Sequence, residues 1–298
     1  MLKAEKVCKR FGDHIVLQDL DCHVDNGTIY GLVGFNGAGK TTLLKIMAGI
    51  YKPEGGGAFL DGQNVWENEE AKQRTLFVPD DVYFLPRCTM KSMAKFYKGF
   101  YPNLDFTLFQ KLAHIFEVDS SKRLSGFSKG MTRQAAVILA LSCRPELLLL
   151  DESFDGLDPI KRKLLKQVLL EAIAQQETSI IISSHNLREL SDLCDHIGQI
   201  RDRRIVFDCA VEDVVATRVK CRVAFAHEQD EQMLQALSPQ NLTKSGRILM
   251  FETTGTEEQI KTALQPAELL LLEILPMTLE EILISQGGAK EYDLSNLF

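Results

Sequence analysis

One glycine-rich segment of the chain has the residue types and the spacing of a phosphate-binding loop (P-loop). It comprises Gly34, Phe35, Asn36, Gly37, Ala38, Gly39, Lys40, Thr41 and Thr42. In such a loop the glycines let backbone N–H groups turn toward a phosphate, the lysine reaches the β- and γ-phosphates, and the first hydroxyl binds Mg²⁺. The segment therefore predicts that Lys40 and Thr41 bind ATP and Mg²⁺. A glycine turn with a chance lysine is the alternative interpretation.

The residues on both sides of this loop have the pattern that a phosphate site needs. Residues 28–33 form a short apolar run that is typical of a buried strand. After the loop, apolar residues recur at helical spacing before Gly49, at Leu43, Leu44, Ile46 and Met47. Because the N–H groups and the dipole at a helix N-terminus favour negative charge, a strand, a glycine turn and a helix together form an anion site.

A second candidate for chemistry is the pair of acids at the end of an apolar run. Leu147 to Leu150 are followed directly by Asp151 and Glu152. Asp151 would hold Mg²⁺, and Glu152 would polarise the water that attacks the γ-phosphorus. Taken alone, two acids after apolar residues can equally be a solvated strand end. The P-loop upstream favours the catalytic interpretation.

A third segment lies between the first two and begins an apolar helix. Phe127, Ser128, Lys129, Gly130 and Met131 precede a nearly continuous apolar stretch over 135–141. Ser128 can cap this helix, whose free N–H groups would then point toward an anion. Apolarity on all sides predicts a buried helix, which fixes the position of that terminus. A serine cap without any ligand is the simpler alternative.

With these three segments in this order, the chain resembles the ATP-binding subunits of ABC transporters, and most of all bacterial subunits that serve separately encoded permeases. The family signature reads LSGGQ. Ser128 and Gly130 match its serine and second glycine, whereas Lys129 and Met131 replace its first glycine and its glutamine. The string Leu124-Ser125-Gly126 matches the start of the motif more closely, but it lacks the next glycine and comes too early, so we interpret it as a decoy.

The resemblance implies roles for further residues within the first 210 or so positions. Phe11 stands where the family has an aromatic residue that stacks on adenine, although core packing would also explain it. The segment from Asp155 to Asp158 matches the D-loop, and His185 matches the switch histidine that contacts the γ-phosphate. A lone histidine at a strand end is more often a surface or packing residue. The ordered series of motifs favours the switch role.

One departure from the family affects the predicted metal site. Asp80 stands where the family has its Q-loop glutamine, and Asp81 follows it. A carboxylate oxygen can bind Mg²⁺, but it adds negative charge beside phosphate and cannot donate a hydrogen bond. We therefore expect Thr41, Asp151 and Asp80 to be the metal ligands. The rate of ATP hydrolysis, or its coupling to the partner, could then differ from that of the family. Ser153-Phe154 in place of the usual Pro-Thr is a further departure. Because Lys40, Asp151, Glu152 and His185 are all present, hydrolysis remains the expectation.

The pattern of elements predicts an α/β fold of the P-loop ATPase type with a mixed sheet, a helical subdomain and a small C-terminal α+β appendage. Short strand-like segments before the P-loop indicate an antiparallel region. The apolar runs 147–150 and 179–183 are typical of parallel strands buried on both faces. We expect an ATPase domain over 1–212, with its helical subdomain at about 86–142, and an accessory domain over 213–298. Thr278-Leu279-Glu280-Glu281 has the pattern of a capping box and predicts the start of a last helix.

The helical subdomain contains a stripe of methionines and aromatic residues whose role has two interpretations. Met90, Met93, Phe96, Tyr97 and Phe100 recur at helical spacing. Core packing explains such a stripe, and so does an adaptable docking surface, because methionines and aromatic residues are common at both. Each interpretation can hold for a different face of the helix.

Composition and charge exclude several other classes of protein. The 298 residues include 45% hydrophobic residues, but no apolar run approaches the ~20 residues that span a bilayer. The charged N-terminus does not resemble a secretory signal. Seven scattered cysteines without a C-x-x-C pair predict reduced thiols in a cytoplasmic protein. The net charge of −7 argues against general binding of nucleic acid.

The resemblance also implies partners. The chain has one P-loop and one signature, and in this family the signature of one subunit covers the nucleotide of the other. We therefore expect a homodimer or heterodimer that encloses two ATP molecules, bound to a membrane-spanning permease at the inner face of the cell membrane. Two alternatives are a soluble ABC ATPase that acts as a mechanical clamp in assembly, and a regulatory ATP-binding module with low turnover.

Overall fold

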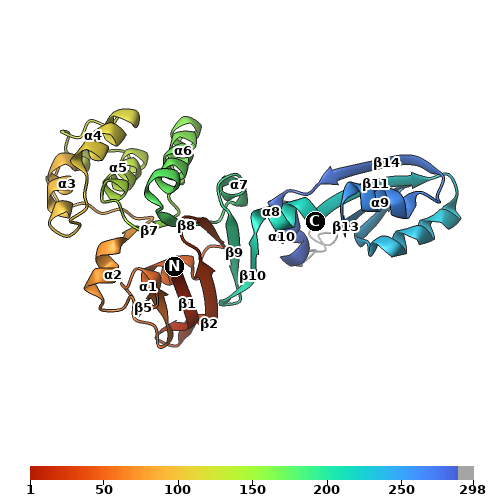
Figure 1. The fold of residues 1–298 in the computed structure, drawn as a ribbon, viewed down its shortest axis with the longest axis horizontal. Coiled ribbons are helices and arrows are strands. Elements are labelled where there is room, and N and C mark those ends of the chain that lie inside the picture. Colours follow the sequence, from red (N-terminus) through yellow and green to blue (C-terminus); the bar gives the residue numbers. More distant parts are fainter. Residues whose placement is uncertain (288–298) are drawn as a thin grey trace, which may run out of the picture. The chain divides into compact units, whose positions relative to one another are not determined.

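In the computed structural model, the described part of the chain comprises residues 1–287, with the side chains at 215–217, 228–231, 283, 284, 286 and 287 excepted. The chain divides into two compact units, Met1–Asp208 and Cys209–Phe298 (Figure 1). Residues 288–298 of the expected accessory domain lie outside the described part.

The first unit begins with an antiparallel sheet in the order β2-β1-β4-β5. Its strands are β1 (Leu2–Phe11), β2 (His14–Val24), β4 (Gly55–Leu60) and β5 (Gln63–Asn64). A tight turn with positive φ at Asp61 and Gly62 joins β4 to β5, as expected for an Asp-Gly hairpin. The predicted antiparallel region is confirmed.

A second, six-stranded sheet carries the segments that the chemistry needs, in the order β10-β9-β3-β8-β7-β6. Its strands are β3 (Ile29–Val33), β6 (Thr75–Val78), β7 (Leu147–Asp151), β8 (Ser179–Ser184), β9 (His196–Arg201) and β10 (Arg204–Ala210). All residues of β3, β7 and β8 are buried, and these strands pair in parallel. Because parallel strands end at one edge of a sheet, the loops after β3, β7 and β8 lie together.

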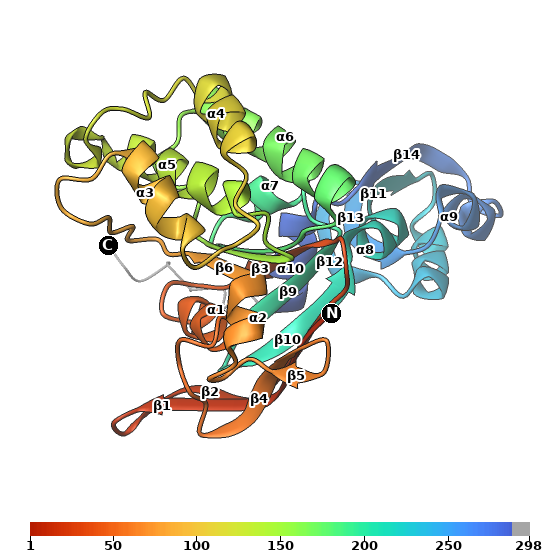
Figure 2. The same ribbon diagram turned by 60° about the vertical axis from the view of Figure 1, so that its left-hand side comes forward.

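Seven α-helices accompany the two sheets in the first unit. They are α1 (Lys40–Met47), α2 (Glu69–Arg74), α3 (Met90–Lys98), α4 (Phe106–Ile115), α5 (Lys129–Ser142), α6 (Pro159–Gln176) and α7 (Leu187–Leu190). Helix α1 lies between the two sheets (Figure 2), where Leu43 and Leu44 join one buried cluster with Leu20, Leu149 and Ile181. Helices α3 and α4 both pack against α5.

The cysteines agree with the expectation of reduced thiols. All seven are free. Burial raises the pKa of Cys22 and of Cys143 to about 12, so these thiols stay protonated and unreactive at neutral pH. They fill space in the core.

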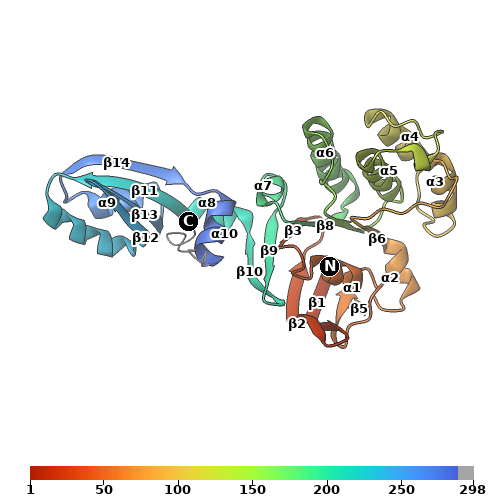
Figure 3. The ribbon, with the colours of Figure 1, turned by 180° about the vertical axis from the view of Figure 1, so that it is seen from behind.

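The second unit is an α+β sandwich in which helices cover one face of an antiparallel sheet. Its elements are α8 (Val211–Thr217), β11 (Arg218–Phe225), a 3₁₀ segment (Glu228–Leu237), β12 (Gln240–Ser245), β13 (Ile248–Thr254), α9 (Glu257–Leu264), β14 (Leu269–Pro276) and α10 (Leu279–Gly287). The strand order is β12-β13-β11-β14. Figure 3 shows α9 against this sheet, and Ile260 and Leu264 pack there on Cys221 and Phe251.

Within this unit one predicted feature is confirmed and one strand is new. Thr278 and Glu281 form the expected capping box at the start of α10, with hydrogen bonds of 3.0 and 3.3 Å. Strand β12 was not expected from the sequence, since all six of its residues are exposed and show no apolar alternation. No helix in residues 1–287 is long and apolar enough to cross a membrane.

Candidate functional site

The P-loop joins β3 to α1, and the backbone conformation at two of its glycines shapes it. Gly37 and Gly39 have φ of 81° and 107°, a region that residues with a Cβ avoid. A Cβ on Gly39 would also lie 2.8 Å from Leu17 Cδ2. Gly39 precedes α1, whose first N–H groups are therefore open to an anion. The exposed part of the loop consists of Phe35, Asn36 and Gly37, and Thr41 is exposed on the first turn of α1.

Lys40 is the cation of this site and it is buried. Its side chain has a relative exposure of 6%, and its ammonium donates a hydrogen bond of 2.7 Å to the carbonyl oxygen of Gly34. Its Nζ also lies 3.1 Å from Glu152 Oε1. The side chain thus connects the P-loop to the acid at the end of β7, across 112 positions of sequence (152 − 40).

The two acids at the end of β7 lie in different environments. Asp151 is 1% exposed, and its Oδ1 accepts a hydrogen bond of 2.6 Å from Ser183 Oγ. The same hydroxyl accepts a bond of 3.1 Å from the backbone N–H of Glu152. Glu152 has φ of 46°, a conformation that costs a non-glycine residue energy and that recurs at functional sites. Its carboxylate reaches both Lys40 and His185.

His185 follows β8 and contacts the same carboxylate. Its Nδ1 lies 3.0 Å from Glu152 Oε2, and its backbone N–H donates to that oxygen at 3.3 Å. Ligand atoms of Glu152, Asp155 and His185 all lie within 4.8 Å of one another. The structure therefore brings Lys40, Glu152 and His185 together, and it adds Asp155, for which the sequence suggested no chemical role.

The signature segment begins helix α5 and rests on the D-loop. Ser128 caps the helix by accepting a hydrogen bond of 3.3 Å from the N–H of Met131. A Cβ on Gly130 would lie 2.7 Å from the carbonyl oxygen of Gly156, so only glycine permits this contact. The decoy string Leu124–Gly126 forms a separate 3₁₀ turn before the helix. Asp158 caps α6 by accepting from the N–H of Lys161 at 2.9 Å.

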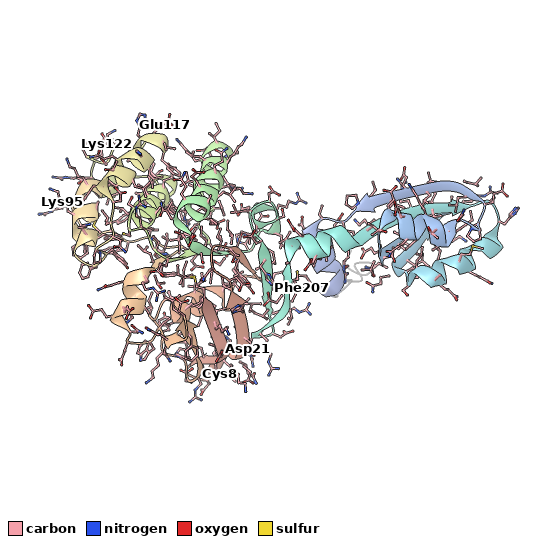
Figure 4. All side chains as sticks on the ribbon, viewed as in Figure 1. Cys8, Asp21, Lys95, Glu117, Lys122 and Phe207 are labelled. Carbon is pink, nitrogen blue, oxygen red and sulfur yellow. The ribbon has the colours of Figure 1, made fainter. Side chains whose placement is uncertain are left out.

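A pocket of about 330 Å³ lies beside this segment, and Ser128, Gly130 and Asp158 contribute to its lining. On its wall Glu117, labelled in Figure 4, pairs with Lys161 at 2.6 Å. The pocket is formed by groups from the helical subdomain, the signature and the D-loop. It is separate from the P-loop, none of whose residues contributes to its lining.

Phe11 ends β1 and is 47% exposed, which the core-packing alternative does not explain. Its ring meets Tyr51 edge to face, with 5.6 Å between centroids, and Lys9 Nζ lies 5.3 Å from its centroid. Tyr51 follows α1 and was not expected at this place. An exposed aromatic face can stack on a base.

Asp80 follows β6, and its carboxylate is bound to a cation. Oδ1 accepts a short hydrogen bond from the guanidinium of Arg133 on α5. Nothing in the sequence pattern had singled out Arg133. The expected role of Asp80 as a metal ligand stays a prediction, but the carboxylate already has a partner within the chain.

Comparison with known proteins agrees with this geometry. Residues 17–155 match the family described as "ABC transporter". The chain is 28% identical over 293 residues to the ABC transporter ATP-binding protein YtrB of Bacillus subtilis, covering 97% of this chain and 99% of that protein. It is 30% identical over 224 residues to the bacitracin transport ATP-binding protein BcrA of Bacillus licheniformis, covering 69% and 68%.

Solved structures share the fold. An ATP-binding subunit of an ABC transporter superposes with a TM-score of 0.67 at 24% identity, covering 72% of this chain and 91% of that one. A bacterial ABC transporter cassette solved as a dimer gives 0.64 at 18%, covering 71% and 99%.

A P-loop ATPase fold with this ordered set of loops therefore defines the class. The chain belongs to the ABC transporter family, as one of its ATP-binding proteins. It binds and hydrolyses ATP.

Ser183 offers a test of this geometry, because its hydroxyl holds both acids at the end of β7. Replacing Ser183 with alanine should lower ATP turnover about tenfold, in the range seen when a group that orients a functional ligand is removed. Turnover is measured at saturating ATP. Ser179→Ala is the matched control, since Ser179 is buried at the other end of β8 and accepts from Gly27 N–H. Equal turnover in the two variants would contradict the positioning role of Ser183.

Proposed function

We propose that this protein hydrolyses Mg-ATP at an interface between two ATP-binding subunits and thereby drives a separate membrane permease. The observation that carries the proposal is the network of Lys40, Glu152 and His185 at the ends of β3, β7 and β8. It places a phosphate-binding cation, a general base and a polar sensor around one space. Each group belongs to a different segment of the chain, so a bound nucleotide can contact all three segments and change their positions.

Two residues would hold Mg²⁺. Thr41 offers a hydroxyl beside the P-loop and Asp151 a buried carboxylate. Hard oxygen donors of this kind are those that Mg²⁺ prefers, so the residues fit the ion. Bound there, Mg²⁺ would neutralise charge on the β- and γ-phosphates.

The protein groups have distinct roles in hydrolysis. The Lys40 ammonium would bind the β- and γ-phosphate oxygens, and the backbone N–H groups from Gly37 to Thr42 would complete the anion cradle. Glu152 would accept a proton from the attacking water, and the switch residue His185 would donate to the γ-phosphate. Phe11, exposed beside Tyr51, would stack on the adenine.

The dimer follows from the separation of the two phosphate-facing elements. The pocket at Ser128, Gly130 and Asp158 contains no P-loop residue. A second subunit would bring its own P-loop nucleotide to this pocket, so that two ATP molecules are enclosed. The cassette of similar fold that was solved as a dimer supports this proposal.

The permease would bind at an apolar groove between the core and the helical subdomain. A groove of about 490 Å³ is lined by Leu76 and Phe77 on one side and by Phe96 and Phe100 on the other. Phe96 and Phe100 are 48% and 58% exposed, whereas Met93 is 3% exposed and packs in the core. The stripe of methionines and aromatic residues therefore has one face that packs in the core and one exposed face that is available for docking. Binding of a helix in this groove would place the protein at the inner face of the cell membrane.

Two substitutions test the assignment of catalytic roles. Lys40→Ala should reduce ATP binding and turnover by at least about a hundredfold, because it removes a buried charge aimed at the phosphates. Glu152→Gln should bind ATP with near-normal affinity and lose turnover by a similar factor, because an amide cannot accept the proton. Equilibrium binding of a fluorescent ATP analogue and phosphate release measure the two effects. Wild-type turnover in Glu152→Gln would falsify the role of this carboxylate.

The sandwich proposal is tested with the stalled protein. Glu152→Gln should sediment as a dimer with saturating Mg-ATP and as a monomer with ADP, because only the γ-phosphate spans the two subunits. Adding Ser128→Glu should abolish the dimer, since it places a negative charge beside the partner's phosphate. A monomer at micromolar concentration with ATP would show that the chain does not pair with itself, so that a different subunit must supply the second half.

Permease docking is tested by charge in the groove. Phe96→Glu should abolish binding to membrane vesicles that contain the native permease and leave ATP affinity unchanged. Phe106→Glu is the control, because Phe106 is 39% exposed but does not line the groove. If the wild type never sediments with such vesicles, the soluble clamp becomes the better interpretation. If Phe96→Glu sediments like the wild type, the permease binds elsewhere.

A further inference from the structure

Arg133 is a buried cation on α5 that contacts two loops of the ATPase unit. It belongs to α5, five residues after Ser128, and is 1% exposed. Its Nη2 donates to the carbonyl oxygen of Asp80 at 2.7 Å and also to Asp80 Oδ1. Its Nη1 donates to the carbonyl oxygen of Asp155 in the D-loop. One guanidinium thus joins the signature helix, the loop after β6 and the loop after β7.

The electrostatics of this contact make Asp80 its necessary partner. A buried guanidinium loses its hydration, and hydrogen bonds within the protein must compensate. Arg133 Nε is buried without any partner among the described residues, so the compensation rests on its two terminal nitrogens. The carboxylate of Asp80 is the single anion paired with Arg133 in the described part of the chain. Asp80 is itself 48% exposed, so it can be replaced without opening a cavity.

We propose that the Asp80–Arg133 ion pair is a positioning element: Asp80 holds in place the guanidinium that connects the signature helix to the D-loop, and Asp80 serves this pair instead of binding Mg²⁺. An aspartate at this position, in place of a glutamine, is then matched by an arginine 53 positions later. Its effect on turnover rests on the proposed function. The contact itself does not.

The Arg133 contact is connected to Glu152 by one backbone turn of the D-loop. The N–H of Asp155 donates to the carbonyl oxygen of Glu152 at 3.1 Å, and Arg133 holds the carbonyl of the same Asp155. Gly130 lies against Gly156 in the next position of the D-loop. Loosening the ion pair therefore frees the turn that orients Glu152, without touching Lys40 or Thr41. We expect turnover to change and ATP affinity to stay the same.

The test uses three variants of the full chain. Asp80→Asn removes the charge and keeps the shape, Arg133→Gln removes the cation, and the double variant combines them. Asp81→Asn is the matched control, because it removes the same charge from the next residue, for which no hydrogen bond or ion pair is seen within residues 1–287. For each protein we would measure turnover, ATP affinity, the Mg²⁺ concentration for half-maximal turnover, and deuterium uptake at 152–158.

The expected result is specific to an ion pair. Asp80→Asn should lower turnover roughly fivefold, raise uptake at 152–158 and leave ATP affinity and the Mg²⁺ requirement unchanged. In the Arg133→Gln background the same substitution should have less than about a twofold further effect, because interacting residues are not additive. If Arg133→Gln does not fold, the comparison of Asp80→Asn with Asp81→Asn decides the matter.

Two results would overturn the proposal. An increase of about tenfold or more in the Mg²⁺ requirement of Asp80→Asn would make Asp80 part of the metal site, because removal of even an outer-shell partner of a metal ligand costs about that much affinity. Unchanged deuterium uptake at 152–158 would show that the pair does not hold the D-loop. Because uptake is measured without nucleotide, it stays informative even if the stalled Glu152→Gln protein never dimerises, so failure of the sandwich and failure of the ion pair are distinguishable.

Discussion

The parallel register of β3, β7 and β8 is the constraint on which the site depends. Asp151 pairs with Ser183, and Val33 pairs with Ser184, so the P-loop, the two acids and His185 begin at one level of the sheet. All three strands are buried on both faces. A shift of register by one residue would exchange the side chains between the two faces. It would also move Asp151 away from the Ser183 hydroxyl that holds it.

The same register brings the carboxylate of Glu152 to the ammonium of Lys40, so that the two charges balance. The Lys40 side chain is 6% exposed, so its ammonium needs anions or carbonyl oxygens to compensate for lost hydration. The carbonyl of Gly34 and the carboxylate of Glu152 provide this within the chain. A triphosphate that enters the loop brings stronger negative charge to the same ammonium. In the proposed mechanism this releases the Glu152 carboxylate from Lys40, so that nucleotide binding would prepare Glu152 to act on water.

The sequence predicted those elements whose signals are local, and it missed elements that lack such signals. Buried parallel strands can be recognised in the sequence as continuous apolar runs. The capping box at Thr278 can be recognised because it requires only four consecutive residues. Strand β12 has neither signal, since its polar residues are held in place by pairing with β13. The stripe around Met93 and Phe96 could not be divided into its buried and exposed faces until the packing of α3 was known.

By itself the sequence determined that a P-loop, an acidic strand end and a capped signature helix are present, because each depends on residues that are neighbours in the chain. Only the tertiary structure decided which of their side chains meet. Ser183 reaches Asp151 across 32 positions, and Arg133 reaches Asp80 across 53. Such contacts depend on the order of strands in a sheet and on the packing of α5. No local pattern encodes the partner of a buried charge, and here that partner changes the role we assign to Asp80.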